Sequence, residues 1–261
     1  MIRNILKSRF NKDYRALKRL SKKQRYTNGE VRIKGFKYSF PDARSFVFMY
    51  KELFEKQIYK FKANTNSPYI IDCGANIGMG ILYFKQIYPE SQVLAFEPEK
   101  SIYNSLRKNL KDNNINNVEI VSKAVWKEEA ILSFLNEGAD ANRIEMLGQD
   151  ENLGEKYLVE AIRLSKYIDR EVDLLKMDIE GAELEVLKEI EPKMNLIKNI
   201  FIEYHSFSKQ DQRLDELLNI LSRNEFRYYI DSPNGISNSP FINRGNFLSM
   251  DFFLNIYCYR D

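Results

Sequence analysis

The sequence predicts an α/β protein with a Rossmann-like fold built on a mostly parallel sheet. Three observations lead to this prediction. From residue 68 onward, short apolar runs alternate with segments of helical periodicity, and this rhythm implies parallel strands joined by right-handed crossovers. The first apolar run ends in an aspartate followed by a glycine-bearing turn and a helix. The length of 261 residues suits one large α/β domain with an appendage.

The chain begins with a strongly basic arm. Residues 1–25 hold ten Lys or Arg and one acid, Asp13, which leaves 30 basic and 36 acidic residues for the remainder. Apolar side chains recur in the arm at three- to four-residue intervals, on one face of a predicted helix: Ile2, Leu6, Phe10, Tyr14, Leu17 and Leu20. Such a helix can pack on its own domain or lie on anionic lipid, so peripheral membrane contact through residues 1–25 stays open. Nucleic acid is not an expected partner, because the arm lacks a recognisable binding motif and the acidic remainder would repel phosphate.

Two short strands and a helix follow the arm. Residues 31–33 and 36–40 alternate in polarity and are predicted to pair, and residues 45–61 have helical spacing. We therefore predict a basic arm and helical extension over residues 1–62 and a cofactor-binding domain over residues 63–261.

The remaining elements are predicted in order along the chain. Strands are expected at 69–73, 92–97, 118–122, 172–178, 199–205, 226–230 and 251–259. Helices are expected at 79–88, 101–113 and 211–222, with another beginning at Ala182. Additional strands at 131–135 and 158–164 flank a polar loop over 136–154, which is predicted as a lid, a substrate loop or a disordered segment.

The turn between the first strand and its helix has the chemistry of a nucleoside site. Gly74 can adopt backbone angles closed to other residues, and Gly78 lets the helix start close to the strand or to a ligand. Glu97 ends the second strand nineteen residues beyond Gly78, where a carboxylate can accept both hydroxyls of a ribose. Asn76 stands where a dinucleotide fingerprint has its middle glycine, and Asp72 would repel a pyrophosphate but attract an ammonium or sulfonium group. S-adenosylmethionine carries both cations and is the predicted cofactor, with a nicotinamide-dependent oxidoreductase as the alternative.

Several separated motifs resemble the FkbM family of S-adenosylmethionine-dependent methyltransferases. They occur in order at Asp72–Gly78, Ala95–Pro98, Leu106–Asn109, Ala124–Val125 and Lys176–Glu183. The resemblance implies a class I methyltransferase fold, with a seven-stranded sheet that ends in an antiparallel C-terminal hairpin. It also implies O-methylation, with a sugar hydroxyl of a glycan or another small molecule as the acceptor.

The resemblance and the sheet geometry together give a set of cofactor-binding candidates. Ligands of open α/β sheets bind beyond the carboxyl ends of the strands, which places Asp178 and Glu180 beside the cofactor. In related enzymes the loop after the third strand meets the adenine, which implies Lys123 and Ala124, mainly through backbone groups. The full set is Asp72, Gly74, Ala75, Asn76, Gly78, Glu97, Pro98, Lys123, Ala124, Asp178 and Glu180. The segment before the core could also fold back over the methionine end of the cofactor through Tyr50 or Glu52, although both suit helix packing.

The predicted catalytic residues are Asp178, Glu203 and His205. The strand over 199–205 brings Glu203 and the only histidine of the chain to the ligand side of the sheet. His205 could act as a general base with Glu203 orienting it, or Asp178 could accept the proton itself. The same residues and Glu180 could collect magnesium or manganese, so a divalent metal is compatible but not expected. A non-catalytic binding module that retains the fold remains a further alternative.

Composition suggests a cytoplasmic protein. The sequence has no run of eighteen apolar residues and no apolar signal-peptide core, and its two cysteines form no disulfide framework. The expected location is therefore the cytoplasm, with peripheral contact at the inner face of the membrane still open. The oligomeric state is not predicted.

Overall fold

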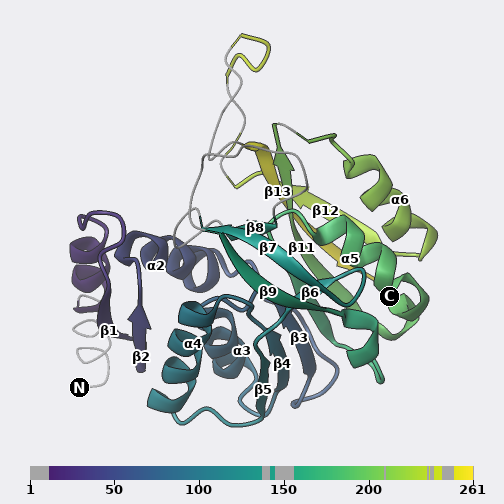
Figure 1. The fold of residues 1–261 in the computed structure, drawn as a ribbon. Coiled ribbons are helices and arrows are strands. Elements are labelled where there is room, and N and C mark those ends of the chain that lie inside the picture. Colours follow the sequence, from purple (N-terminus) through teal and green to yellow (C-terminus); the bar gives the residue numbers. More distant parts are fainter. Residues whose placement is uncertain are drawn as a thin grey trace.

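A large central sheet organises the chain (Figure 1). The computed structural model describes residues 12–136, 142–144, 156–208, 210–233, 235, 238–242 and 250–260. Over these residues the sheet has seven strands in the order β12-β13-β11-β10-β3-β4-β5. They are β3 (Tyr69–Cys73), β4 (Gln92–Phe96), β5 (Val118–Val121), β10 (Leu174–Met177), β11 (Asn199–Phe207), β12 (Arg227–Asp231) and β13 (Met250–Tyr259).

The strand directions confirm the predicted fold class. Strands β5, β4, β3, β10 and β11 run parallel, whereas β13 pairs antiparallel with both β11 and β12. The last two strands therefore form the expected C-terminal hairpin, and β13 lies between β12 and β11. Because the five parallel strands end on one side, their carboxyl ends share a single edge of the sheet.

Helices cover both faces of the sheet because its strands are buried on both faces. Ile70 of β3 packs into one hydrophobic cluster and its neighbour Ile71 into the other. Side chains of α3 and α4 belong to the cluster of Ile70, and those of α5 and α6 belong to the cluster of Ile71. In Figure 1, α3 and α4 lie toward the left of the molecule and α5 and α6 toward its right. These helices are α3 (Met79–Ile87), α4 (Lys100–Asp112), α5 (Glu183–Ile190) and α6 (Leu214–Arg223).

A second sheet departs from the core after β5. It contains β6 (Ala124–Trp126), β7 (Ala130–Asn136), β8 (Asn142–Ile144) and β9 (Lys156–Arg163) in the order β6-β9-β7-β8. The expected strands near 131–135 and 158–164 are present as β7 and β9. The prediction of a loop over 136–154 was wrong in one respect, because β8 lies inside this segment and pairs with β7. Most of that loop lies outside the described residues.

The predicted helix over 45–61 is shorter than expected. It forms α2 (Ala43–Tyr50) and continues as a six-residue π-helix, η1 (Lys51–Lys56). Asp42 caps α2 by accepting hydrogen bonds from the backbone N–H groups of Arg44 and Ser45. Gln57 adopts a left-handed conformation with a φ of 59°, which ends the helix before residue 61.

The N-terminal extension packs directly on the core. Its hairpin of β1 (Gly29–Ile33) and β2 (Phe36–Phe40) is antiparallel, as predicted. The Asn109 side chain ties this hairpin to the core, because it bonds to the backbone of Ser39 in β2 and donates to Ile77 O in the turn before α3. The extension shares one hydrophobic cluster with α3 and α4, and the proposed boundary at residue 62 remains a prediction.

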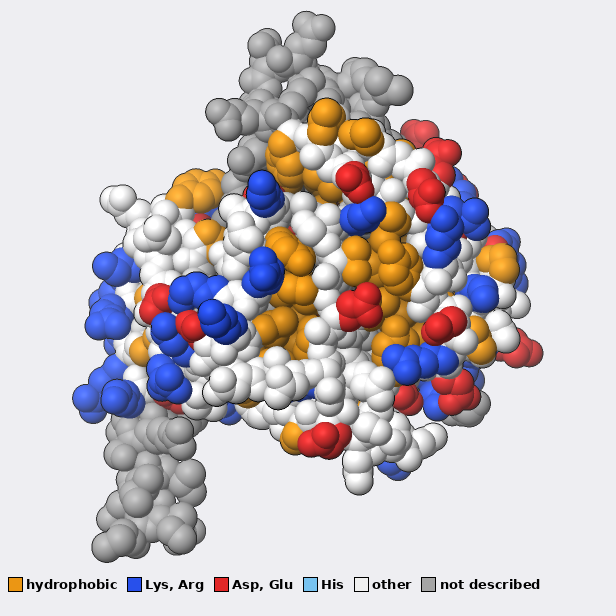
Figure 2. All heavy atoms as spheres, turned by 60° about the horizontal axis from the view of Figure 1, so that its bottom comes forward, with side chains coloured by type: hydrophobic (Ala, Val, Ile, Leu, Met, Phe, Trp, Pro, Cys, Tyr) orange, Lys and Arg blue, Asp and Glu red, His pale blue; other side chains and the backbone are white. Residues whose placement is uncertain are grey.

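The basic arm is helical over residues 12–20, and its first eleven residues lie outside the described part of the chain. Leu17 and Leu20 are buried in the cluster shared with α3 and α4, whereas Tyr14 is 58% exposed. Figure 2 shows Lys and Arg side chains gathered at the left, over the N-terminal elements. Peripheral membrane contact through residues 1–25 therefore stays open. Among the described helices, none combines the length and apolar character that a membrane span requires.

Candidate active site

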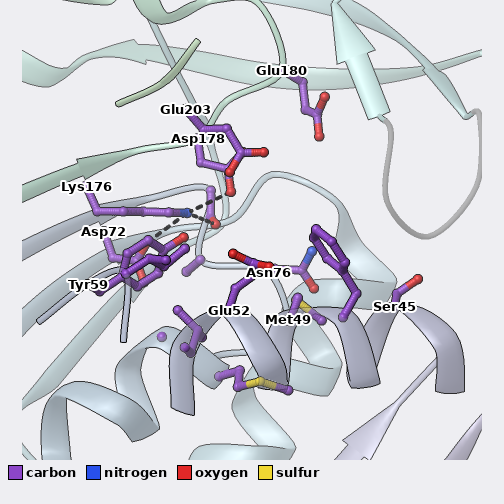
Figure 3. A pocket seen from close by; sticks show the side chains of 17 residues that line it. Ser45, Met49, Glu52, Tyr59, Asp72, Asn76, Lys176, Asp178, Glu180 and Glu203 are labelled. Carbon is purple, nitrogen blue, oxygen red and sulfur yellow. Dashed lines mark hydrogen bonds and ion pairs between the residues drawn. The ribbon is translucent and has the colours of Figure 1, made fainter. Parts of the chain in front are cut away.

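A cavity of about 140 Å³ lies where β3 and β10 end, beside the middle of β11 (Figure 3). The turn after β3, the acids Asp178 and Glu180 that follow β10, and Glu203 within β11 form part of its lining. The helical segment of α2 and η1 forms another wall. Of the predicted cofactor-binding residues, the cavity also brings together Asp72, Gly74, Ala75 and Asn76.

Glycine is required at the tightest point of this turn. Gly74 has a φ of +80°, and a Cβ atom added there would stand 1.9 Å from Asp178 O. The backbone N–H groups of Gly74 and Ala75 both donate to Phe96 O, which fixes the turn against β4. Asn76 takes a φ of +50°, a left-handed conformation that asparagine tolerates better than most residues. A side chain at position 74 would therefore collide with the end of β10, and the turn could not keep this conformation.

The Glu97 side chain stabilises the turn through hydrogen bonds. Its side chain accepts hydrogen bonds from Asn76 N at 2.9 Å and from Glu99 N at 2.9 Å. Burial raises the pKa of Glu97 to about 7, although both backbone donors favour the ionised form. Glu97, Gly78 and Pro98 are not among the described residues that line the cavity, so their predicted contact with a cofactor stays a prediction.

A buried lysine links the ends of β3 and β10. Lys176 donates to Cys73 O at 3.1 Å and to Gly74 O at 2.6 Å. Its Nζ atom also lies 3.3 Å from an Asp72 oxygen and 3.5 Å from an Asp178 oxygen. Burial alone would lower the pKa of Lys176, but Asp72 and Asp178 raise it well above its usual value. Lys176 therefore holds two of the predicted site carboxylates in place.

Glu183 anchors His205. Its Oε1 atom lies 3.0 Å from His205 Nδ1 and accepts hydrogen bonds from the backbone N–H groups of Ile179 and Gly181. In this turn, Glu180 and Gly181 have φ angles of 55° and 98°, so both residues adopt left-handed conformations. One buried carboxylate thus fixes both the turn after β10 and the histidine ring on β11.

The other ring nitrogen of His205 faces two acids. Nε2 lies 3.5 Å from Glu203 Oε1 and 3.6 Å from Glu180 Oε2. Burial alone would lower the pKa of His205, but Glu180 and Glu183 raise it well above its usual value. The predicted role as a general base needs a neutral imidazole, and these carboxylates favour the charged form instead. His205 is also not among the described residues that line the cavity, whereas Asp178 and Glu203 are.

The three predicted catalytic residues lie together. One ligand atom from each of Asp178, Glu203 and His205 lies within 4.8 Å of the others. Two carboxylates and one imidazole suit a divalent cation such as magnesium or manganese, and Glu183 would orient the imidazole from the second side. The sequence left a divalent metal compatible but not expected, and this geometry does not change that expectation.

Lys123 and Ala124 lie away from this cluster. The Lys123 side chain pairs with Glu160 at 2.8 Å, and Ala124 begins β6 and is buried in the core. Neither is among the described residues of the cavity wall, so a backbone contact with adenine stays a prediction.

Sequence reasoning missed two residues and left a third undecided. Lys176 and Glu183 belong to the Lys176–Glu183 motif, and the signal for Lys176 was a charge inside an otherwise apolar strand. Of the two candidates in the preceding helix, Glu52 lines the cavity. Tyr50 is buried and stacks on Phe54 with ring centroids 4.9 Å apart.

Comparison with known proteins gives one family and two related methyltransferases. The family model described as Methyltransferase FkbM domain matches residues 72–228. Methyltransferase 1 of Beauveria bassiana (strain ARSEF 2860) is 30% identical over 190 residues, covering 64% of this chain and 76% of that protein. Methyltransferase sdnD of Sordaria araneosa is 33% identical over 193 residues, covering 60% of this chain and 73% of that protein.

The fold was also compared with solved structures. The methyltransferase FkbM from Methylobacillus flagellatus KT aligns with a TM-score of 0.49 at 18% identity. The alignment covers 76% of this chain and 45% of the Methylobacillus chain, so this chain spans less than half of that protein.

Proposed function

This chain belongs to the FkbM family of methyltransferases, and we propose that it transfers a methyl group from S-adenosylmethionine to a sugar hydroxyl of a glycan or glycosylated metabolite. The observation that carries the proposal is the acidic cavity at the glycine turn, with Glu203 and His205 beside it. Membership of this family argues against the alternative hypothesis of a nicotinamide-dependent oxidoreductase.

The cavity suits a cationic cofactor. Its described lining includes five acids and one lysine, Lys176, which is already engaged by Asp72 and Asp178. Such a wall favours the sulfonium and ammonium groups of S-adenosylmethionine and disfavours a pyrophosphate. Gly74, Ala75 and Asn76 of the turn line the cavity, so a bound ligand would lie against this segment.

Each residue has a proposed part in holding the cofactor. The backbone from Gly74 to Asn76 and the carboxylate of Asp72 would contact the methionine portion. Glu97 would accept the ribose hydroxyls if the ligand reaches past the turn. When bound, S-adenosylmethionine supplies an activated methyl group on its sulfonium sulfur.

Glu203 is the proposed general base for the acceptor hydroxyl. It lines the cavity directly, and burial together with the nearby Asp178 raises its pKa, which makes it a better proton acceptor near neutral pH. His205 stands behind it at 3.5 Å and would orient its carboxylate, while Asp178 is held by Lys176. Glu203 is therefore the proposed base and His205 the group that orients it, which reverses the roles expected from the sequence.

The same wall supports a sugar as the acceptor. Carboxyl groups accept hydrogen bonds from the hydroxyls of a sugar, and Glu180 lines the cavity together with Glu203, the proposed base. Phe48 also lines the cavity and is half exposed, so it offers an aromatic face against which a sugar ring could pack.

Two measurements test this proposal. The first is isothermal titration of the protein with S-adenosylhomocysteine, and no binding would refute the cofactor assignment. The second follows transfer of labelled methyl groups from S-adenosylmethionine to a panel of glycans. Glu203→Gln should lower turnover by about 10²- to 10⁴-fold and leave S-adenosylhomocysteine affinity unchanged. The exposed Glu128→Gln is the matched control, and equal turnover of both variants would exclude Glu203 as the base.

A further inference from the structure

The N-terminal extension supplies one wall of the cavity. Residues of α2, of η1 and of the segment after it line the cavity, and all of them precede residue 72, where the family match begins. Figure 3 shows this helical wall below Asp178 and Glu203, with the turn that carries Asn76 between them. The cavity is therefore closed by a part of the chain that the family match does not cover.

The π-helix aims one acid into the cavity. In η1, Leu53 and Phe54 pack into the core and Glu55 is exposed, whereas Glu52 lines the cavity with 7% of its surface exposed. The Glu52 carboxylate points from the helix toward the turn with Asn76 (Figure 3). The wide π turn is closed by Gln57 N, which donates to Glu52 O, and Ile58 N donates to the same oxygen at 3.2 Å. Single π-helical turns of this kind occur frequently at functional sites.

Glu52 has a weak partner of its own. Lys56 pairs with it at 2.8 Å, but the lysine side chain is 54% exposed, and exposed ion pairs contribute little. Lys176, the cation in the described lining, is already bonded to Cys73 O and Gly74 O and lies beside two aspartates. A largely buried carboxylate in this position is best compensated by a cation that enters with the ligand.

We propose that Glu52 binds the α-ammonium group of the methionine portion of the cofactor, an inference that rests on the proposed function. The methionine portion is assigned to the turn from Gly74 to Asn76, and Glu52 points toward that turn. An ammonium group donates hydrogen bonds to a carboxylate, whereas a sulfonium group has no hydrogen to donate. The extension thus completes the cofactor site.

The experiment compares two ligands that differ in the amino-acid portion. S-adenosylhomocysteine carries it, and 5′-methylthioadenosine keeps the adenosine and the sulfur but lacks the ammonium group. Isothermal titration of Glu52→Gln should show S-adenosylhomocysteine bound about 10- to 100-fold more weakly than by the wild type, with 5′-methylthioadenosine within about twofold. Glu55→Gln removes the same charge from an exposed position of η1 and should change neither affinity.

The outcomes separate this inference from the function beneath it. A wild-type protein that binds neither ligand refutes the proposed function. If the wild type binds both ligands, an unchanged S-adenosylhomocysteine affinity in Glu52→Gln overturns the role of Glu52, and so does equal weakening of both ligands. Glu52→Asp keeps the charge but shortens the side chain by one methylene, and it provides a second test if Glu52→Gln does not fold. It should also weaken S-adenosylhomocysteine selectively, and equal affinity for that ligand would count against the contact.

Discussion

Binding of S-adenosylhomocysteine should weaken about tenfold when the pH falls from 8 to 6, because Glu97 must be ionised to accept the ribose hydroxyls. Burial raises the pKa of Glu97 to about 7 in the free protein. About 90% of the side chain is then ionised at pH 8 and about 10% at pH 6. If the ligand binds the ionised form, the apparent affinity follows this fraction.

The assay is isothermal titration at half-unit steps between pH 6 and 8.5, with Glu97→Gln as the matched variant. The glutamine cannot titrate, so its affinity should be lower at pH 8 and should change less with pH than that of the wild type. Other groups near the cavity also titrate, and the difference between the two proteins isolates the contribution of Glu97. Parallel pH profiles for both proteins would refute the assignment of Glu97 to the ribose.

The same group predicts a pH effect on folding with a definite sign. A carboxyl whose pKa is raised by burial contributes stability that is present below its unfolded pKa of 4.5 and is lost as the pH rises through about 7. The size of the loss is about 3 kcal/mol for a shift of this order. Urea unfolding should therefore show the stability of the wild type falling relative to that of Glu97→Gln between pH 4.5 and 7. A difference between the two proteins that does not change with pH would contradict a buried Glu97 with a raised pKa.

Three further substitutions test the architecture of the site. Gly74→Ala should abolish cofactor binding and lower the melting temperature, because the new Cβ would meet Asp178 O at 1.9 Å from a left-handed backbone; calorimetry that shows a wild-type melting temperature would contradict this. Lys176→Met should lower the free energy of unfolding in urea by about 3–5 kcal/mol, because it leaves Asp72 and Asp178 without their cation. A loss below about 1 kcal/mol would show that water solvates the two aspartates. Asp42→Ala should cost about 1–2 kcal/mol at neutral pH by removing the cap of α2. Backbone donors hold the pKa of Asp42 below its usual value despite burial. This cost should therefore be complete above about pH 3.9 and shrink as the pH falls through the lower pKa of the folded protein, and a cost independent of pH would exclude a capping carboxylate.

Local sequence was sufficient for the strand, turn and helix around the proposed cofactor site. Asp72, Gly74 and Gly78 stand where the prediction placed them, because strand burial and the left-handed turn depend on residues within a few positions of each other. Glu97 was also predictable, since it follows the next apolar run and meets the same turn through Asn76 N. The helix over 45–61 failed at its end, because periodicity does not show that Gln57 leaves the helical conformation.

Other parts of the site depend on residues distant in sequence. Lys176 meets Asp72 across the pairing of β10 with β3, and the sequence pattern does not state which strands become neighbours. Glu183 reaches His205 because α5 begins beside the end of β11, so that a residue assigned to a helix orients one assigned to a strand. The raised pKa of His205 follows from that packing and changes its proposed role.

By itself, the sequence determined the fold class, the glycine turn and the acids at the strand ends, because periodicity and turn chemistry are local properties of the chain. Tertiary structure decided the insertion of β13 between β11 and β12, the second sheet, and the wall that brings Glu52 to the cavity. These features arise from strand pairing and from the packing of layers whose residues lie far apart in the chain. Local patterns show which side chains are charged or apolar, but only the packed layers decide which of them meet.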